Sequence, residues 1–377
     1  MEYKLIEDHD SLDKMIAQCV DVTELAIDTE FIRQRTYYPI LGLFQLYNGI
    51  DTYLIDPLAF DDLTPLWQLL DRHPVILHAC SEDLDVFMTV ANKIPDFFHD
   101  SQIAAAFGGL GPSLGFGGLV SHYQDIELDK GASRSNWLLR PLSQTQLNYA
   151  AADVFHLLPC WTELKAKLDE LGYYDYYLQE VDNLRLRKMR KKQPKTVYKQ
   201  FKNASLLNRQ QLATLQALGE WRENNATERD MAVNFVVKEA HLVEVAKHQP
   251  KSLFELNKLG LLPIEIKRQG KRILQIVQQT SDIDENECPE LLSRISDYPG
   301  YKKIVQSLKQ HIANASEETQ IPAELIGSKK LINELLSWVW KLDDTAKMTA
   351  QKPLLLSNWR SEIVGNKLLA HLTSMTK

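Results

Sequence analysis

The stretch AIDTEF, residues 26–31, carries two carboxylates inside what otherwise reads as a buried β-strand. Side chains alternate across a strand, so Asp28 and Glu30 share one face. The flanking Leu25 and Ile27 indicate that this strand is well covered. Two like charges about 7 Å apart repel each other unless something lies between them. The stretch therefore predicts a site for a cation.

Alternating strand and helix patterns fill the first half of the chain. Short apolar runs predict strands at residues 25–31, 40–47, 52–55 and 75–78. One helix is predicted by apolar residues at helical spacing behind a capping Asp10 or Ser11, and another begins near Ser143 and ends at Gly172. This mixture indicates an α/β domain.

The composition is that of a globular protein large enough for two or three domains. The 377 residues are 44% hydrophobic and 25% charged. No apolar run approaches the roughly 18 residues that a membrane span needs, and the N-terminus is acidic and polar, unlike a signal peptide. The four cysteines lack metal-like spacing and suit a reducing compartment, as small buried residues. These features predict a cytoplasmic protein that does not bind membranes.

Charge is distributed unevenly along the chain. Residues 1–177 hold 27 acidic and 11 basic residues, a net charge of −16, whereas residues 178–377 hold 23 and 32, a net charge of +9. Much of the positive excess lies in residues 184–202, which contain nine basic residues and no acidic one. Such a run is commonly a solvated linker, but it can also hold a phosphate backbone.

The second half of the chain reads as helices and contains a repeat. Residues 228–246 align with residues 318–336 at a constant offset of 90 positions, which pairs apolar residues such as Leu242 and Ile332. Two copies of a small helical module are predicted, although any two amphipathic helices resemble each other to some degree.

Two further groups of chemically active residues accompany the first. Glu82, Asp83 and Asp85 open a predicted helix after a short strand, where acidic residues commonly complement the helix dipole. Tyr149 and Asp153 lie one turn apart on a later helix, away from its apolar face. Surface exposure explains an isolated aspartate there, but not the paired tyrosine.

Together these groups resemble the motif set of the DEDD 3′–5′ exonucleases, in the variant that contains tyrosine. The stretches AIDTEFIRQRTYYPILGLFQLY, ILHACSEDLDVF, SRSNWLLRPLS and NYAAADV look in particular like the ribonuclease D family. The helical repeats resemble the HRDC module, which is named after helicases and ribonuclease D. The resemblance covers essentially the whole chain. It implies an α/β, RNase H-like exonuclease domain, with a mixed sheet flanked by helices, followed by two all-α HRDC helical domains.

The resemblance makes Asp28, Glu30, Asp83 and Asp153 the metal ligands and gives Tyr149 the role of orienting the attacking water. It selects Asp83 over its acidic neighbours, which spacing alone leaves open. Hydrolysis of a phosphodiester needs a hydroxide nucleophile and a stabilised leaving oxyanion, and two cations about 3.5–4 Å apart can supply both. Carboxylate ligands favour Mg²⁺ or Mn²⁺, so two divalent metal ions are the expected cofactors.

Substrate contacts are predicted from residue type and position. Tyr38 can stack on a terminal base. Lys130, Arg134, Trp137 and Arg140 lie in a segment with few acidic residues, just before the helix that carries the paired tyrosine, where they can grip the substrate backbone. The alternatives are core packing for the aromatic residues and structural ion pairs for the basic ones.

The sequence thus predicts a metal-dependent 3′–5′ exoribonuclease that releases nucleoside 5′-monophosphates. The expected parts are residues 1–183 as the exonuclease domain, 184–204 as a basic linker, 205–284 as the first HRDC domain and 285–377 as an HRDC-like second one. By resemblance, a monomer acts on RNA with single-stranded 3′ ends, such as transfer-RNA precursors and small structured RNAs. A DNA exonuclease on the same fold is the alternative enzyme, and the intact set of site residues opposes a non-catalytic RNA-binding scaffold.

Overall fold

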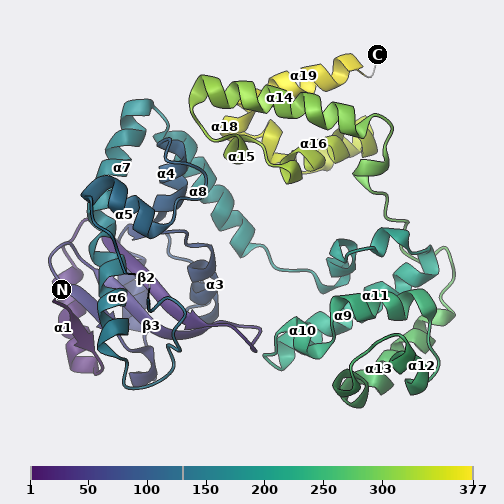
Figure 1. Cartoon of the computed structure of the whole chain (residues 1–377), viewed down its shortest axis with the longest axis horizontal. Coiled ribbons are helices and arrows are strands. Elements are labelled where there is room, and N and C mark those ends of the chain that lie inside the picture. Colours follow the sequence, from purple (N-terminus) through teal and green to yellow (C-terminus); the bar gives the residue numbers. More distant parts are fainter. Residues whose placement is uncertain (1, 130, 376–377) are drawn as a thin grey trace. The chain divides into compact units, whose positions relative to one another are not determined.

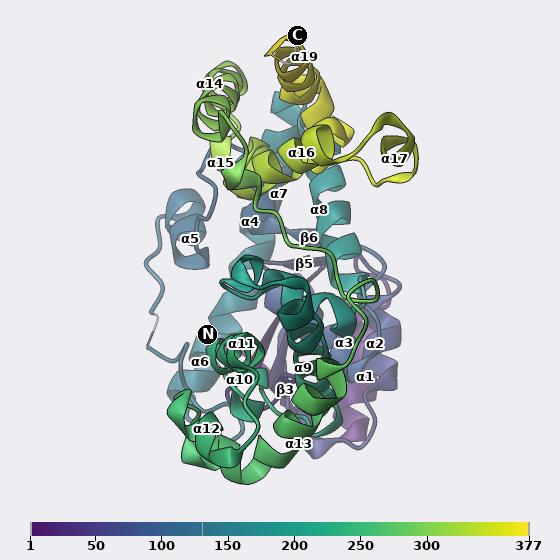
Figure 2. The ribbon, with the colours of Figure 1, turned by 90° about the vertical axis from the view of Figure 1, so that its right-hand side faces the viewer.

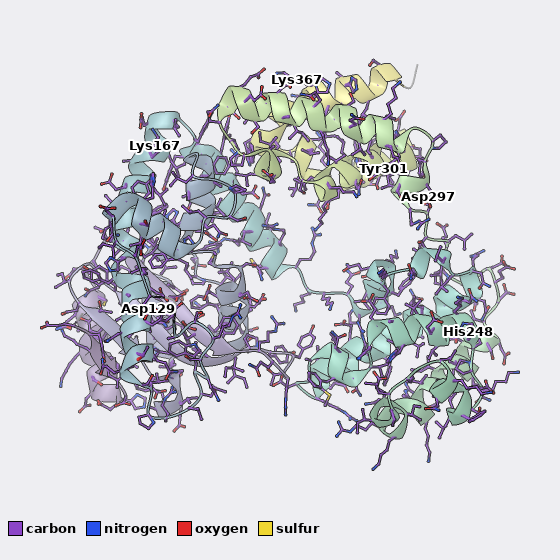
Figure 3. All side chains as sticks on the ribbon, in the orientation of Figure 1. Asp129, Lys167, His248, Asp297, Tyr301 and Lys367 are labelled. Carbon is purple, nitrogen blue, oxygen red and sulfur yellow. The ribbon has the colours of Figure 1, made fainter. Side chains whose placement is uncertain are left out.

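The computed structural model describes residues 2–129 and 131–375, which fall into two compact units (Figure 1). The first unit comprises Met1–Ile32, Leu41–Arg190 and Tyr298–Lys377, and the second comprises Arg33–Ile40 and Lys191–Asp297. Asp297, where the second unit ends, and Tyr301, just inside the returning first unit, are labelled in Figure 3. Each unit is described by itself.

A six-stranded sheet forms the centre of the first unit. Its strands are β1 (Lys4–Ile6), β2 (Leu25–Ile32), β3 (Ile40–Tyr47), β4 (Thr52–Ile55), β5 (Val75–Leu77) and β6 (Phe98–Asp100). They lie in the order β1-β4-β3-β2-β5-β6, with β3 antiparallel to β4, and with β1–β4, β2–β5 and β5–β6 parallel. The sheet is therefore mixed, and the strand that contains AIDTEF lies in its interior with neighbours on both sides.

Eight helices follow or interrupt these strands. They are α1 (His9–Cys19), α2 (Thr64–Leu70), α3 (Ser81–Val90), α4 (Ser101–Phe107), α5 (Phe116–Gln124), α6 (Gln144–Phe155), α7 (Leu157–Leu171) and α8 (Tyr174–Met189). Ser143 caps α6 and a left-handed Gly172 ends α7, as predicted, but the single helix expected between them is broken at His156. Pro159 lacks an amide and crowds the preceding turn, so a continuous ladder of hydrogen bonds cannot pass this point.

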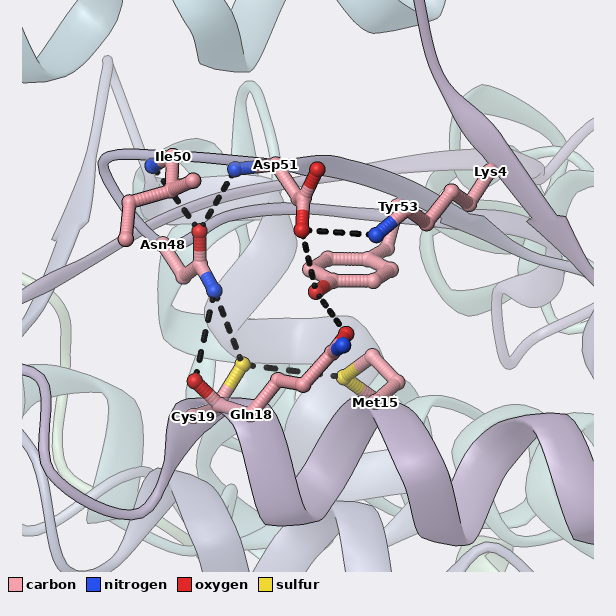
Figure 4. A network of polar contacts seen from close by, with 8 residues as sticks. All are labelled: Lys4, Met15, Gln18, Cys19, Asn48, Ile50, Asp51 and Tyr53. Carbon is pink, nitrogen blue, oxygen red and sulfur yellow. Dashed lines mark hydrogen bonds and ion pairs between the residues drawn. The ribbon is translucent and has the colours of Figure 1, made fainter.

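Polar contacts fix α1 beneath the turn between β3 and β4 (Figure 4). The helix begins behind Asp8, which accepts the Ser11 amide at 2.8 Å and is the cap in place of the predicted Asp10 or Ser11. At its other end, the Tyr53 hydroxyl donates to Gln18 Oε1 at 2.7 Å, and Asn48 Nδ2 lies 3.7 Å from Cys19 Sγ. All four cysteines are unpaired and buried, as their spacing predicted.

A helical module forms the C-terminal part of the first unit (Figure 2). It consists of α14 (Tyr301–Thr319), α15 (Ala323–Ile326), α16 (Lys329–Lys341), α17 (Asp344–Thr349), α18 (Asn358–Arg360) and α19 (Asn366–Met375). An ion pair of 2.6 Å between Arg360 Nη1 and Glu180 Oε2 joins α18 to α8, and both side chains are buried. This module is therefore part of the same compact body as the sheet.

The second unit holds the other helical module. It consists of η2 (Pro194–Gln200), α9 (Arg209–Glu228), α10 (Val233–Val236), α11 (Glu239–His248), α12 (Leu253–Lys258) and α13 (Pro263–Ser281). Short 3₁₀ or π turns in the two units are η1 (Pro57–Ala59), η3 (Ala204–Leu206), η4 (Ile295–Asp297), η5 (Leu354–Leu356) and η6 (Ser361–Gly365). α10 and α11 begin 90 positions before α15 and α16, which confirms the predicted repeat. No helix among the described residues combines the length and apolar character that crossing a bilayer requires.

The segment predicted as a basic linker is largely structured. Residues 184–189 continue α8, and the side chains of Val197, Tyr198 and Phe201 lie in the core of the second unit. Several of its cations are engaged, since Lys188 pairs with Asp85 and Lys192 with Glu223, at 2.8 and 2.7 Å. Only part of the predicted positive charge is therefore available to a polyanion.

The segment Arg33–Ile40, which connects β2 to β3, belongs to the second unit. Asp230 Oδ1 accepts the backbone amides of Tyr37 and Tyr38 at 3.0 and 2.9 Å, and the Ala232 amide donates to the Arg35 carbonyl at 2.8 Å. The Tyr37 side chain packs against the apolar core of that unit. The chain thus leaves the sheet directly after the AIDTEF strand and is fastened to the helical module.

Candidate active site

Three carboxylates meet at the centre of the sheet. Asp28 and Glu30 extend from β2, and Asp153 extends from α6, which packs against β2. One carboxylate oxygen from each of the three lies within 4.8 Å of the others. A capping box between Ser143 and Gln146 fixes the N-terminus of α6, the helix that carries Asp153.

Asp83 borders this group from the first turn of α3. Its carboxylate accepts a hydrogen bond from the Thr29 hydroxyl on β2, and the side chain is 7% exposed. Its acidic neighbours are placed differently, because Glu82 is exposed and Asp85 pairs with Lys188. The structure therefore separates Asp83 from Glu82 and Asp85, which spacing alone could not do.

These carboxylates destabilise one another's charged forms. Removal from water raises the pKa of Asp28 well above its ordinary value, and the charges of Asp83 and Asp153 raise it further. The same causes, burial first, raise the pKa of Glu30 to about 9. Burial raises the pKa of Asp153 to about 7, against a lowering by the hydrogen bond from Tyr149. Without a cation, the cluster therefore retains protons at neutral pH.

The donor set fits a divalent metal ion. All four candidate ligands are carboxylates, and the oxygens of Asp28, Glu30 and Asp153 are close enough together to share one ion. Hard oxygen donors suit Mg²⁺ and Mn²⁺, whereas zinc sites draw mainly on histidine and cysteine. The named causes that raise the pKa values of Asp28 and Glu30 are burial and neighbouring carboxylates, and a bound cation would offset both.

Tyr149 lies beside this cluster, one turn before Asp153. Its hydroxyl forms a hydrogen bond with Asp153, and its ring packs near the buried Trp137, with centroids 6.2 Å apart. Burial, followed by the charges of Asp153 and Glu30, raises the pKa of Tyr149 far above its ordinary value. The phenol is therefore neutral at physiological pH and presents an O–H group to the site.

Comparisons with known proteins identify the family. Residues 3–169 match the 3′-5′ exonuclease family, residues 211–277 the HRDC domain, and residues 299–368 the C-terminal HRDC domain of ribonuclease D. Ribonuclease D of Psychromonas ingrahamii is 41% identical to this chain over 97% of its length and 99% of the relative's. The chain belongs to the ribonuclease D family.

Other comparisons agree with this assignment. Ribonuclease D of Escherichia coli strain K12 is 42% identical, over 98% of both chains. The crystal structure of Escherichia coli RNase D matches with a TM-score of 0.94 and 40% identity, covering 99% of each chain. As a ribonuclease D family member with a 3′-5′ exonuclease domain of the type that depends on divalent metal, the chain is a hydrolytic 3′–5′ exoribonuclease.

The residues predicted to contact the substrate of this ribonuclease D chain differ in their exposure to solvent. Tyr38, with 41% of its surface exposed, lies in the segment held by the second unit, and Arg134 is exposed. Lys130 lies outside the described residues. Trp137 is 1% exposed and fills the space beside Gly42, where any Cβ would meet its backbone and Cβ at 2.7 Å. Trp137 is therefore a core residue behind Tyr149, and its burial does not support contact with RNA.

One contact of this site was not evident from the sequence. Thr29 alternates with Asp28 and Glu30 along the strand, and its hydroxyl donates a hydrogen bond to the Asp83 carboxylate. The partner is 54 positions away, and no local pattern reports such a bond. Arg140, which was also predicted to grip the substrate backbone, pairs with Asp56, in agreement with the alternative of a structural ion pair.

Proposed function

We propose that this chain removes nucleotides from RNA 3′ ends with two divalent ions, Mg²⁺ or Mn²⁺, and releases nucleoside 5′-monophosphates. The observation that carries this proposal is the group of carboxylate oxygens from Asp28, Glu30 and Asp153 within 4.8 Å, with Asp83 alongside. A single ion needs fewer protein carboxylates than four, because Mg²⁺ usually keeps several waters and binds one or two carboxylates. Four ligands in one cluster therefore favour two ions.

The four carboxylates would hold the ions, which when bound supply a Lewis acid for the phosphate and charge to balance the attacking and leaving oxygens. Asp28 is central in this assignment, because its pKa responds to the charges of Asp83, Asp153 and Glu30 alike. It is the residue best placed to contribute to both ions.

Tyr149 is assigned to orienting the attacking water. Its raised pKa excludes a phenolate acting as the general base, because the neutral phenol is the form present at physiological pH. The hydroxyl donates to Asp153, so its oxygen lone pairs remain available to accept a hydrogen bond from water. Trp137 packs behind the ring and restricts its position.

The proposed substrates are transfer-RNA precursors and other small structured RNAs with single-stranded 3′ tails. The Escherichia coli relative is described as an exoribonuclease involved in structured RNA processing, and this chain matches it over 99% of both lengths. We further propose that the chain acts as a monomer in the cytoplasm, where its four unpaired cysteines stay reduced.

One experiment tests direction, sugar and metal together. Single-stranded RNA and DNA of equal sequence, labelled at the 3′ or the 5′ end, are incubated with Mg²⁺, Mn²⁺ or EDTA. The proposal expects immediate release of labelled mononucleotide from 3′-labelled RNA, a ladder from 5′-labelled RNA, and no reaction in EDTA. Equal rates on DNA would favour the DNA exonuclease, and activity in EDTA would remove the metal assignment. The Asp28→Asn variant controls for a contaminating nuclease.

A further inference from the structure

The turn that leads into the Asp83 helix has a strained backbone. β5 ends at Leu77, α3 begins at Ser81, and Ala79 between them has φ of 55°, in the left-handed region that favours glycine. A residue other than glycine holds that conformation only where its surroundings enforce it. Asp83 lies in the first turn after this segment, so the conformation of the turn determines where its carboxylate lies.

Asp100 is the group that enforces the turn. The residue ends β6 and lies in parallel register with Leu77, and its side chain is 3% exposed. Asp100 Oδ1 accepts the amide of Ala79 at 3.1 Å, and Oδ2 accepts the amide of Cys80 at 2.9 Å. The same carboxylate caps α4 by accepting the Gln102 amide at 2.8 Å. One buried carboxylate at the end of β6 thus binds two consecutive amides of the turn, one of them that of the strained Ala79.

The surrounding contacts give the same segment further support. The Ser101 hydroxyl donates to the Leu77 carbonyl at 3.0 Å, and its oxygen lies 2.9 Å from Nδ1 of His78. The cap residue of α3, Cys80, makes no side-chain capping bond of its own. The segment before the Asp83 helix is therefore held by Asp100, which accepts its amides, and by Ser101, which donates to the carbonyl that ends β5.

We propose that Asp100 is a positioning residue for divalent-metal binding, which acts by holding the β5–α3 turn so that Asp83 stays beside Asp28 and Glu30. The inference rests on the metal site of the proposed function and adds a residue that does not touch the ions. Ligands must be held to within about 0.5 Å for productive geometry, and supporting hydrogen bonds commonly supply that constraint. Asparagine at this position offers only one acceptor, so its NH₂ group would face one of the two amides.

The test measures Mn²⁺ binding to the full chain without RNA, by calorimetry or by the resonance of free Mn²⁺. Asp100→Asn should weaken binding about 10- to 100-fold, the usual effect of losing a supporting partner. Adding Ala79→Gly to that variant should restore several-fold of the affinity, because glycine adopts a left-handed conformation without strain. Asp56→Asn is the control for the loss of another buried carboxylate, since Asp56, at the end of β4, accepts the Leu58 amide and also pairs with Arg140.

A second variant keeps the test independent of Asp100 itself. The side chain of Ala79 is exposed, so Ala79→Val adds no clash with the core but disfavours the left-handed turn, and it should weaken Mn²⁺ binding as Asp100→Asn does. Melting temperatures in EDTA separate this effect from general instability. The role of Asp100 is overturned if folded Asp100→Asn or Ala79→Val binds Mn²⁺ with wild-type affinity, or if Asp56→Asn loses as much Mn²⁺ affinity as Asp100→Asn. Either result leaves the proposed metal site intact. Absence of Mn²⁺ binding by the wild-type chain overturns the proposed metal site as well.

Discussion

Two groups of buried charge in the first unit are built in opposite ways. Arg360 and Glu180 neutralise each other at 2.6 Å, and the Arg360 guanidinium also donates to the carbonyl oxygens of Leu325 and Ile326. Asp28 is instead surrounded by carboxylates, and after burial the charges of Asp83, Asp153 and Glu30 are the main causes that raise its pKa. The ion pair is complete in the folded chain, whereas the acidic cluster is completed by a cation.

The difference separates a contact that supports the fold from one that supports the reaction. A buried pair that loses one partner leaves an uncompensated charge, so its removal destabilises the protein. A cluster of like charges behaves in the opposite sense, because removing one member relieves repulsion while it removes a ligand. Stability and activity should therefore respond to mutation in opposite directions at the two places.

The largest effect is expected for Asp28→Asn. The change removes a carboxylate near all the other ligands, so turnover should fall below a few per cent of wild type at saturating metal, with RNA affinity within a few-fold. The melting temperature in EDTA should stay equal or rise, because repulsion is reduced. Asp85→Asn, which removes the partner of Lys188 on the same α3 helix as Asp83, should keep its activity. Substantial turnover by Asp28→Asn would end the metal-ligand assignment.

Arg360→Met should show the reverse pattern. It leaves Glu180 buried without its partner, so urea unfolding should report a loss of about 3–5 kcal/mol, while turnover per folded molecule is unchanged. Combining it with Glu180→Leu should restore most of the stability, because no charge then remains buried. A loss below about 1 kcal/mol would place this pair among the weak surface contacts and remove the contrast with the active site.

Tyr149→Phe tests a residue at the edge of the acidic cluster. The variant loses the hydrogen bond between the Tyr149 hydroxyl and the attacking, hydroxide-like water. A hydrogen bond to a charged group is worth about 1.5–3 kcal/mol, so kcat should fall roughly 10- to 100-fold while KM and metal affinity stay nearly constant. Tyr53→Phe is a matched control, because its hydroxyl bonds Gln18 away from the cluster and its loss should affect only stability. Single-turnover cleavage and melting on one preparation decide the matter. Full-rate but less stable Tyr149→Phe would make the residue structural.

The smallest effect is a pH dependence of the metal-free protein. Burial raises the pKa of Glu30 to about 9 and that of Asp153 to about 7, above the ordinary values near 4 for unfolded carboxyl groups. The folded state therefore binds more protons than the unfolded state, and this contribution to stability is complete below about pH 4 and is lost as pH rises through 7 and 9. Melting temperatures in EDTA should fall over that window, and Mn²⁺ should reverse the fall.

The same scan on Asp28→Asn isolates the contribution of the cluster. The melting temperature of this variant should fall less steeply with pH than that of the wild-type chain, because one repelling charge is missing. Parallel curves for the two proteins would show that other groups cause the decline.

Local patterns were sufficient for the parts of the fold that local chemistry determines. The apolar run around Asp28 predicted an interior strand, Ser143 and Gly172 marked helix ends, and the offset of 90 positions predicted the second module. The break at His156 had a readable cause in Pro159, which the apolar spacing of the surrounding residues concealed.

Contacts between distant residues were beyond the reach of such patterns. Lys188 and Asp85 are 103 positions apart, so neither this ion pair nor the choice of Asp83 among its acidic neighbours has a local signature in the sequence. Trp137 shows the same limit, since the space beside Gly42 that it fills depends on how a sheet strand and a later loop meet. Side-chain type indicated the chemistry at these positions, but burial decided which residues could perform it.

The contacts between Arg33–Ile40 and the rest of the second unit join parts of the chain that are synthesised at different times. Tyr37 and its acceptor Asp230 are 193 positions apart in the chain. At about 5–20 residues per second, roughly 10–40 s pass on the ribosome between the appearance of the two. During that interval the strand that carries Asp28 and Glu30 is already synthesised, while the loop after it still lacks its acceptor. The contacts that hold this loop therefore form only after the Asp230 region of the first helical module has been synthesised.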